Sequence, residues 1–116
     1  MGLSFIQAIA RQEGFNVPGS RPHKRNNPGD IEEGKFSQSH GALPADGNRF
    51  AAWPTPEAGY AAMRSLLTAH YSGLTIEEAL NKWAPPVEND VSAYLKNVIS
   101  WTGMEASTIL TAENIG

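Results

Sequence analysis

Apolar side chains recur at spacings of three and four residues in several stretches of the chain, the pattern of an amphipathic helix. The first predicted helix covers residues 3–13 and stops at Gly14, a residue that commonly ends helices. The second begins with Thr55 as its cap and Pro56 at its first position. Its inward face is marked by Gly59, Met63, Leu66, Leu67 and His70.

Two further helices follow in the second half of the chain. In the third, Thr75 and Glu78 have the spacing of a capping box, and the "APP" after Trp83 ends the helix. The fourth is predicted to begin after Asp90 and to end at Gly103. The tail, residues 105–116, carries little periodicity beyond a short helical turn.

Two short extended pieces are expected between the first and second helices, at residues 26–36 and 48–53. Turn-forming residues separate them, including the pair Asp46-Gly47. Paired with each other, these pieces would form a small β-hairpin lobe. The sequence therefore predicts one domain, residues 1–116, of the α+β class and predominantly α-helical.

Composition narrows the class of protein. The 116 residues are 41% hydrophobic and 18% charged, without cysteine, and carry a net charge of -3. A negative charge disfavours a nucleic-acid binder, although "RPHKR", residues 21–25, groups cations in a predicted loop. No apolar run is long enough to span a bilayer, and the first residues lack the pattern of a signal peptide. We expect a monomer that is made in the cytoplasm.

Glu13 is the first candidate for chemistry. At roughly 100° per residue it projects between Ile6 and Ile9, toward the face that is buried. The last helical turn disfavours a negative charge, and so does partial burial, so both effects are expected to raise the pKa of Glu13. A raised pKa suits a general acid. The alternative is a partly exposed glutamate on the helix rim, paired with Arg11 or the "RPHKR" cations.

Asp30 and Glu32 form a second candidate group, because they flank Ile31 in an expected strand. Side chains alternate along a strand, so an inward Ile31 would place both carboxylates on the other face. Carboxylates opposing an acid at a helix end are the arrangement that glycoside hydrolysis uses. The alternative is a solvated strand edge. The histidines, His23, His40 and His70, lack metal-ligand spacing, and neither metal nor cofactor is expected.

A family resemblance adds to these observations. The segments "ARQEGF", "NNPGDIEEGKF", "HGALPADGNRFAAWPTPEAGYAAM" and "NKWAPPVENDVSAYLKNV" occur in this order. Over about Ile6 to Gly103 the chain resembles small lysozyme-like peptidoglycan hydrolases of bacteriophages and prophages, which are related to the soluble lytic transglycosylases. The resemblance implies a lysozyme-like fold, with a helical lobe, a small β lobe and a saccharide cleft. It also implies cleavage of the β-1,4 bond between N-acetylmuramic acid and N-acetylglucosamine.

The resemblance also implies roles for individual residues. Glu13 matches the family's acid at the end of the first helix of the domain, and Tyr94 matches a tyrosine beside that acid. Asn26 and Asn27 are candidates for binding sugar amides. The alternatives are a core position for Tyr94 and, for the asparagines, capping of the turn at Pro28-Gly29. The chain departs from the lytic transglycosylases by having Gly14 where they usually have serine, and it lacks an "AYNAG"-like motif.

The predicted function is therefore that of a muramidase acting on peptidoglycan glycan strands in the bacterial wall or periplasm, with a phage as one route of delivery. If Asp30 or Glu32 positions a water, the product is a reducing sugar. If neither does, the muramoyl 6-hydroxyl attacks and an anhydro sugar forms. The alternative function is a non-catalytic lysozyme-like component of a phage particle, structural or wall-binding.

Overall fold

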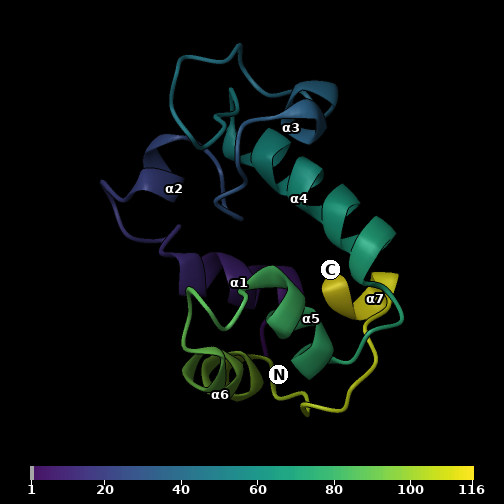
Figure 1. Cartoon of the computed structure of the whole chain (residues 1–116). Coiled ribbons are helices and arrows are strands. Elements are labelled where there is room, and N and C mark those ends of the chain that lie inside the picture. Colours follow the sequence, from purple (N-terminus) through teal and green to yellow (C-terminus); the bar gives the residue numbers. More distant parts are fainter. Residues whose placement is uncertain (1) are drawn as a thin grey trace. The chain divides into compact units, whose positions relative to one another are not determined.

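The computed structural model describes residues 2–116, and this part of the chain is mostly helical (Figure 1). The predicted predominance of helix is confirmed. None of its helices combines the length and the apolar character that crossing a membrane requires. The helices are α1 (Phe5–Glu13), α2 (Arg21–Lys24), α3 (Lys35–Ser39), α4 (Pro56–Tyr71), α5 (Ile76–Trp83), α6 (Val91–Thr102) and α7 (Ala112–Ile115).

Predicted capping signals lie at most ends of the four long helices, although α1 begins at Phe5 rather than at residue 3. At the start of α5, the Thr75 side chain accepts from the Glu78 backbone N–H at 3.1 Å, and Glu78 accepts from the Thr75 N–H at 2.8 Å. Asp90 caps α6 by accepting from the Ala93 N–H at 3.1 Å. Gly103 ends α6 in the left-handed conformation, with φ of 74°. These ends are confirmed because a cap satisfies backbone groups with residues only a few positions away.

The predicted β-hairpin lobe is not confirmed. Residues 26–36 and 48–53 meet at one isolated antiparallel bridge, between Glu32 and Phe50. The prediction was wrong at residues 35–36, which begin helix α3, and in "RPHKR", most of which forms helix α2 rather than a loop. Asp30 is one reason for the short pairing, because its φ of 50° lies outside the extended region.

The described chain divides into two compact units. The central unit is Ile9–Ser65, and the terminal unit comprises the residues up to Ala8 together with Leu66–Gly116. Helices α1 and α4 each continue from one unit into the other.

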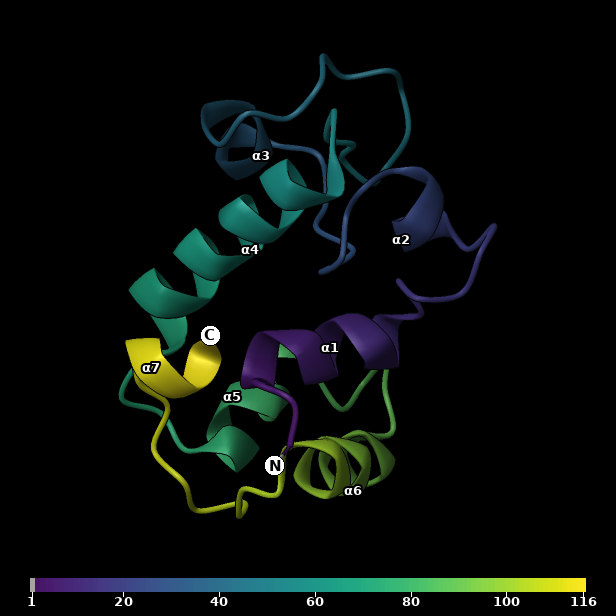
Figure 2. The same ribbon diagram turned by 180° about the vertical axis from the view of Figure 1, so that it is seen from behind.

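In the terminal unit, α5 lies beside α6 (Figures 1 and 2). Both helices and the C-terminal tail contribute buried side chains, namely Ile76, Ala79, Leu80, Val98, Leu110 and Ile115. The tail is held by pairing with the start of α5, where Thr75 and Ile109 form an antiparallel bridge. Both ends of the chain belong to this unit, and the Leu3 N–H donates to the Trp101 carbonyl at 2.8 Å.

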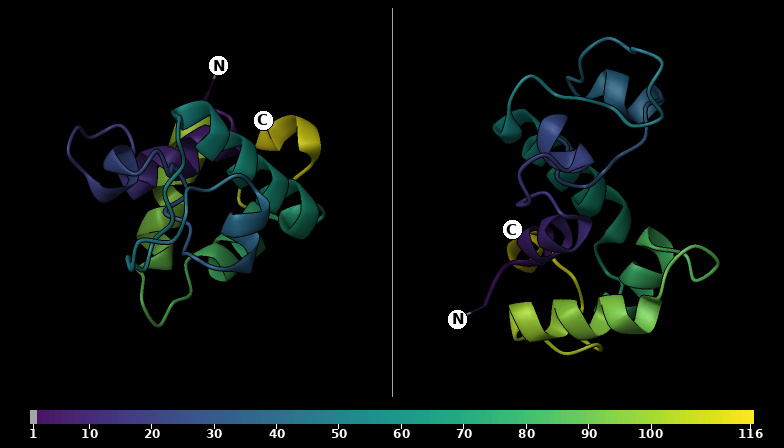
Figure 3. Two further views of the ribbon diagram at one scale, coloured as in Figure 1. Left: turned by 90° about the horizontal axis from the view of Figure 1, so that it is seen from above. Right: turned by 90° about the vertical axis from the view of Figure 1, so that its left-hand side faces the viewer.

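In the central unit, the core lies between the first part of α4 and the segments around α3. Ala51, Trp53 and Ala62 form a buried cluster, against which Ile31 and Phe36 pack among others. Phe36 of α3 packs against this cluster, to which α4 contributes Ala62. Figures 1 and 2 show α3 beside the start of α4, and Figure 3 gives two further views of the ribbon. The Trp53 indole N–H donates to the His40 carbonyl at 2.9 Å, so this tryptophan is a core residue.

Gly59 allows α4 to approach the turn at residues 26–28. A Cβ atom added at Gly59 would lie 1.9 Å from the Asn26 carbonyl oxygen and 2.9 Å from Cδ of Pro28. Both contacts are too short, and the nearer one is with backbone, which cannot rotate away. Any side chain at this position would therefore force α4 away from the turn.

We expect Gly59→Ala to destabilise the protein by about 2 kcal/mol, the usual range for overpacking, even though alanine is the better helix former. The measurement is urea unfolding followed by circular dichroism. Gly34→Ala is the matched control, because Gly34 has extended backbone and nothing within 4 Å of an added Cβ. Equal stabilities for the two variants would contradict the close approach.

Candidate active site

Glu13 lies at the C-terminal end of α1 and is half-buried. The helix ends in a Schellman motif, in which the Phe15 N–H donates to the Ala10 carbonyl at 3.0 Å and the Gly14 N–H to the Arg11 carbonyl at 3.1 Å. Gly14 has φ of 89°, the left-handed conformation that this motif needs. The prediction that Gly14 stops the helix is confirmed. Glu13 is therefore held on a rigid helix end.

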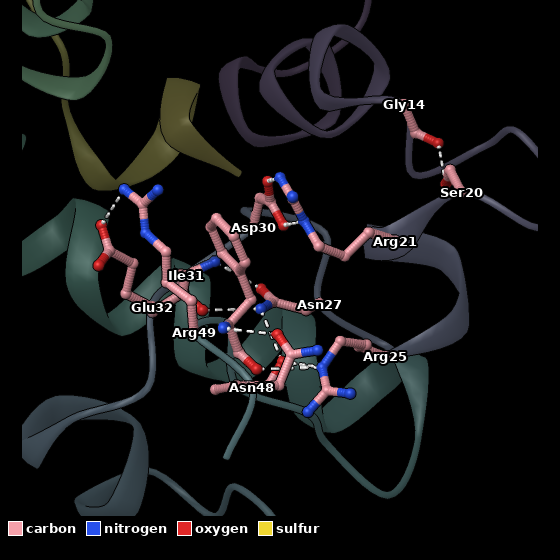
Figure 4. A network of polar contacts seen from close by, with 12 residues as sticks. Gly14, Ser20, Arg21, Arg25, Asn27, Asp30, Ile31, Glu32, Asn48 and Arg49 are labelled. Atoms are coloured by element: carbon pink, nitrogen blue, oxygen red, sulfur yellow. Dashed lines mark hydrogen bonds and ion pairs between the residues drawn. The ribbon is translucent and has the colours of Figure 1, made fainter. Parts of the chain in front are cut away.

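The segment after Gly14 returns to the end of α1 through Ser20. The Ser20 hydroxyl donates to the Gly14 carbonyl at 2.7 Å, and Ser20 is also the N-cap of α2, accepting from the His23 N–H at 3.3 Å. Phe15 packs edge-on against Tyr60 of α4, with ring centroids 5.5 Å apart. One serine thus fixes the start of α2, where Arg21 is the first residue, relative to the turn that follows Glu13 (Figure 4).

Arg21 pairs with Asp30 and interacts through its charge with Glu13 at this end of α1. Its Nε and Nη2 atoms face the two carboxylate oxygens of Asp30, with 2.9 Å from Nε to Oδ1, and Figure 4 shows the paired groups. The guanidinium carbon lies 3.6 Å from the centre of the Phe50 ring. The pKa of Arg21 is raised, chiefly by the hydrogen bond to Asp30; desolvation opposes this rise, and the charges of Asp30 and Glu13 add to it.

Glu13 enters this group through its charge, which raises the pKa of Arg21 together with the charge of Asp30. Arg21, Asp30 and Glu13 therefore lie within electrostatic reach of one another. The raised pKa expected for Glu13 stays a prediction.

Asp30 and Glu32 are separate rather than joined on one strand face. Asp30 has φ of 50°, so the strand alternation used for the prediction does not extend to it. Its side chain is 10% exposed and held by Arg21, while that of Glu32 is 61% exposed and held by Arg49 at 3.2 Å. In Figure 4 the two carboxylates are turned toward different arginines.

Asn27 has a structural position. Its side chain is fully buried; the amide donates to the Ile31 and Ala51 carbonyls at 2.9 Å each, and its oxygen accepts from the Ile31 N–H at 2.8 Å. The predicted sugar contact of Asn27 is therefore corrected to the alternative, a residue that satisfies backbone groups around the turn. Asn26 is half-buried, with φ of 51°, and donates to the Trp53 carbonyl at 3.0 Å.

Tyr94 belongs to the terminal unit, on α6, and its side chain is buried with 4% exposure. A core position was one of the two alternatives that the sequence allowed for this tyrosine. The role of Tyr94 beside the acid stays a prediction.

Sequence reasoning missed the two residues that organise the site, Arg21 and Phe50. The charge cluster "RPHKR" was noticed, but its helical conformation was not predicted. A local signal was present, because Ser20 followed by Pro22 matches an N-cap with proline near the first position of a helix. The stacking on Phe50 had no local signal, since it joins residues far apart in sequence.

Arg25 anchors the other side of this unit. Its Nε donates to the Phe50 carbonyl at 3.0 Å, and its Nη2 pairs with Asp46 at 2.9 Å. The pKa of Asp46 is lowered, first by the hydrogen bond from Arg25 and next by the backbone N–H of Asn48. A carboxyl group whose folded pKa is lowered stabilises the fold above its unfolded pKa of about 3.9, and this contribution is lost as the pH falls through the folded value.

We therefore expect Asp46→Asn to lower the thermal unfolding midpoint at pH 6, and the difference from wild type to shrink as the pH falls below the unfolded pKa of about 3.9. Thermal unfolding measured from pH 2.5 to 7 tests this expectation. Glu88→Gln, which removes an exposed carboxylate outside the ion pairs described here, should leave the midpoint nearly unchanged. A gap between Asp46→Asn and wild type that stays the same size from pH 7 to pH 2.5 would contradict the role of the ion pair.

Comparisons of the chain with models of known protein families and with curated proteins find no match. Within residues 2–116, no group of three or more histidine or acidic side chains is arranged to hold a metal ion.

Proposed function

We propose that this protein is a muramidase that cleaves the N-acetylmuramic acid–β-1,4–N-acetylglucosamine bond of peptidoglycan, with Glu13 as the general acid. The observation that carries the proposal is the position of Glu13, half-buried at a helix end that a Schellman turn and the Ser20 hydroxyl hold rigid. The sequence resemblance to lysozyme-like hydrolases, given above, points to the same residue.

In the proposed reaction, Glu13 gives its proton to the glycosidic oxygen as the bond to the muramoyl C1 breaks. The leaving N-acetylglucosamine keeps that oxygen as its 4-hydroxyl, and positive charge develops on the muramoyl ring, as in an oxocarbenium ion. The Glu13 carboxylate that remains can then accept a proton from the nucleophile. General acid catalysis of this kind contributes about 10²–10⁴-fold to the rate.

The two other carboxylates of the site bear on which nucleophile we propose. Asp30 and Glu32 are each held by an arginine, and Asp30 is nearly buried. A carboxylate engaged in this way is poorly suited to activate a water. We therefore favour attack by the muramoyl 6-hydroxyl, which loses its proton to Glu13 and closes a 1,6-anhydro ring.

The test is digestion of purified peptidoglycan with the wild-type protein, followed by mass spectrometry of the released fragments. We expect 1,6-anhydromuramoyl ends, which are 18 Da lighter than the reducing ends of a hydrolase. Reducing ends would support the muramidase but assign the nucleophile to water. Absence of any cleavage by folded protein would refute the proposal and leave a non-catalytic role in binding the wall or building a phage particle.

A further inference from the structure

We propose that Arg21 binds a carboxylate of the muramoyl part of the substrate, and so makes the site selective for peptidoglycan over uncharged amino-sugar chains. This inference rests on the proposed function, because it concerns the substrate of the same site. It assigns a specificity-determining role to a residue outside the acid itself.

The first support is the way the guanidinium is held. Two of its nitrogens, Nε and Nη2, are occupied by Asp30, and one flat face is covered by the Phe50 ring at 3.6 Å. The third nitrogen, Nη1, has no hydrogen-bond partner within residues 2–116, and the side chain is 50% exposed. An oriented guanidinium with accessible donors binds a carboxylate with little loss of side-chain entropy.

The second support is location. The Ser20–Gly14 hydrogen bond fixes the start of α2 relative to the turn after Glu13, and Arg21 is close enough to Glu13 for their charges to interact. A group bound by Arg21 would therefore lie near the reacting bond. The neighbouring Arg25 is already engaged, because its Nε donates to the Phe50 carbonyl and its Nη2 pairs with Asp46.

The third support is substrate chemistry. Muramic acid differs from glucosamine by a 3-O-lactyl group that ends in a carboxyl. In glycan strands without peptides this carboxyl is free and ionised; in intact peptidoglycan it forms an amide, and the carboxylates lie on the peptide. Chitin oligomers have the same backbone and acetamido groups without either carboxylate. The charge that Arg21 would recognise is thus the feature that distinguishes the two polymers.

The test measures binding by isothermal titration calorimetry on a Glu13→Gln background, in which nothing is cleaved. The probes are the tetrasaccharide of alternating N-acetylglucosamine and N-acetylmuramic acid, the same tetrasaccharide bearing stem peptides, and chitotetraose. Adding Arg21→Gln should weaken binding of a carboxylate-bearing probe about tenfold or more, and of chitotetraose by less than about twofold. The free-lactyl and peptide-bearing probes identify which carboxylate is recognised.

Arg49→Gln is the matched control, because Arg49 also faces the Phe50 ring, at 5.1 Å, and also pairs with a carboxylate. It should affect all probes equally. Arg21→Lys keeps the charge without the two-pronged geometry and should give an intermediate loss, which provides a second reading if Arg21→Gln is unstable. Equal weakening of all probes by Arg21→Gln, or none, overturns the inference. If the Glu13→Gln parent binds no probe, the proposed function itself fails.

Discussion

Replacing Glu13 with glutamine is expected to lower the rate of peptidoglycan cleavage by about 10³-fold, within the range of general acid catalysis. Glutamine has almost the same shape, so the helix end and the Schellman turn should be retained, while the side chain can no longer give up a proton at the glycosidic oxygen. Release of soluble fragments from labelled peptidoglycan, with circular dichroism to verify folding, measures the effect.

Glu33→Gln is the matched control for this substitution. Glu33 is another half-buried glutamate of the central unit, and it accepts hydrogen bonds from the Gln38 side chain at 3.0 and 3.1 Å. Its variant should keep at least about half of the wild-type rate. If Glu13→Gln retained more than about a tenth of the activity, the proton would come from another group, and the assignment of Glu13 would be wrong.

Replacing Asn27 with alanine is expected to cause the largest loss of stability, about 3 kcal/mol or more. The side chain is fully buried and makes three hydrogen bonds with backbone groups of Ile31 and Ala51. Alanine would leave the Ile31 N–H without a partner, and a buried unsatisfied group costs about 1–3 kcal/mol. The Ile31 and Ala51 carbonyls would each lose one hydrogen bond and keep another, from the Ala51 N–H and the Arg25 Nε respectively. The free energy of unfolding in urea, followed by circular dichroism, is the measurement.

Two further variants sharpen this result. Asn27→Asp keeps the shape but directs a carboxylate at two carbonyl oxygens, so it should be at least as unstable as Asn27→Ala at neutral pH. Asn48→Ala removes an exposed asparagine whose oxygen accepts from the Phe50 N–H at 2.9 Å, and it should cost less than about 1 kcal/mol. A small effect at Asn27 would mean that the turn around it is not held by its amide.

The features predicted well from the sequence are those whose causes lie within a few residues. Thr75 and Glu78, Asp90 and Gly103, and Gly14 each determine a helix end by capping backbone groups next to them. Such signals do not depend on what the helix packs against. For the same reason, the position of Glu13 at the end of α1 could be read directly from the chain.

Local signals did not predict the structure of the expected β-hairpin lobe. Extended segments form strands only when a partner continues the hydrogen-bond ladder, and here residues 26–36 and 48–53 pair at a single bridge. Side chains satisfy some of their other backbone groups, as Asn27 does for Ile31 and Arg25 for Phe50. The Ser37 hydroxyl likewise accepts from the Gly34 N–H and starts α3 where a strand was expected.

The sequence by itself determined the helical class, the ends of the long helices and the carboxylate at the end of the first, because capping and amphipathic spacing act locally. Tertiary structure alone decided which residues the polar side chains of the central unit pair with. Arg21 pairs with Asp30 and stacks on Phe50. Glu32 pairs with Arg49. The Asn27 side chain is buried in the core. These outcomes depend on distances between segments far apart in the chain, which no local spacing encodes.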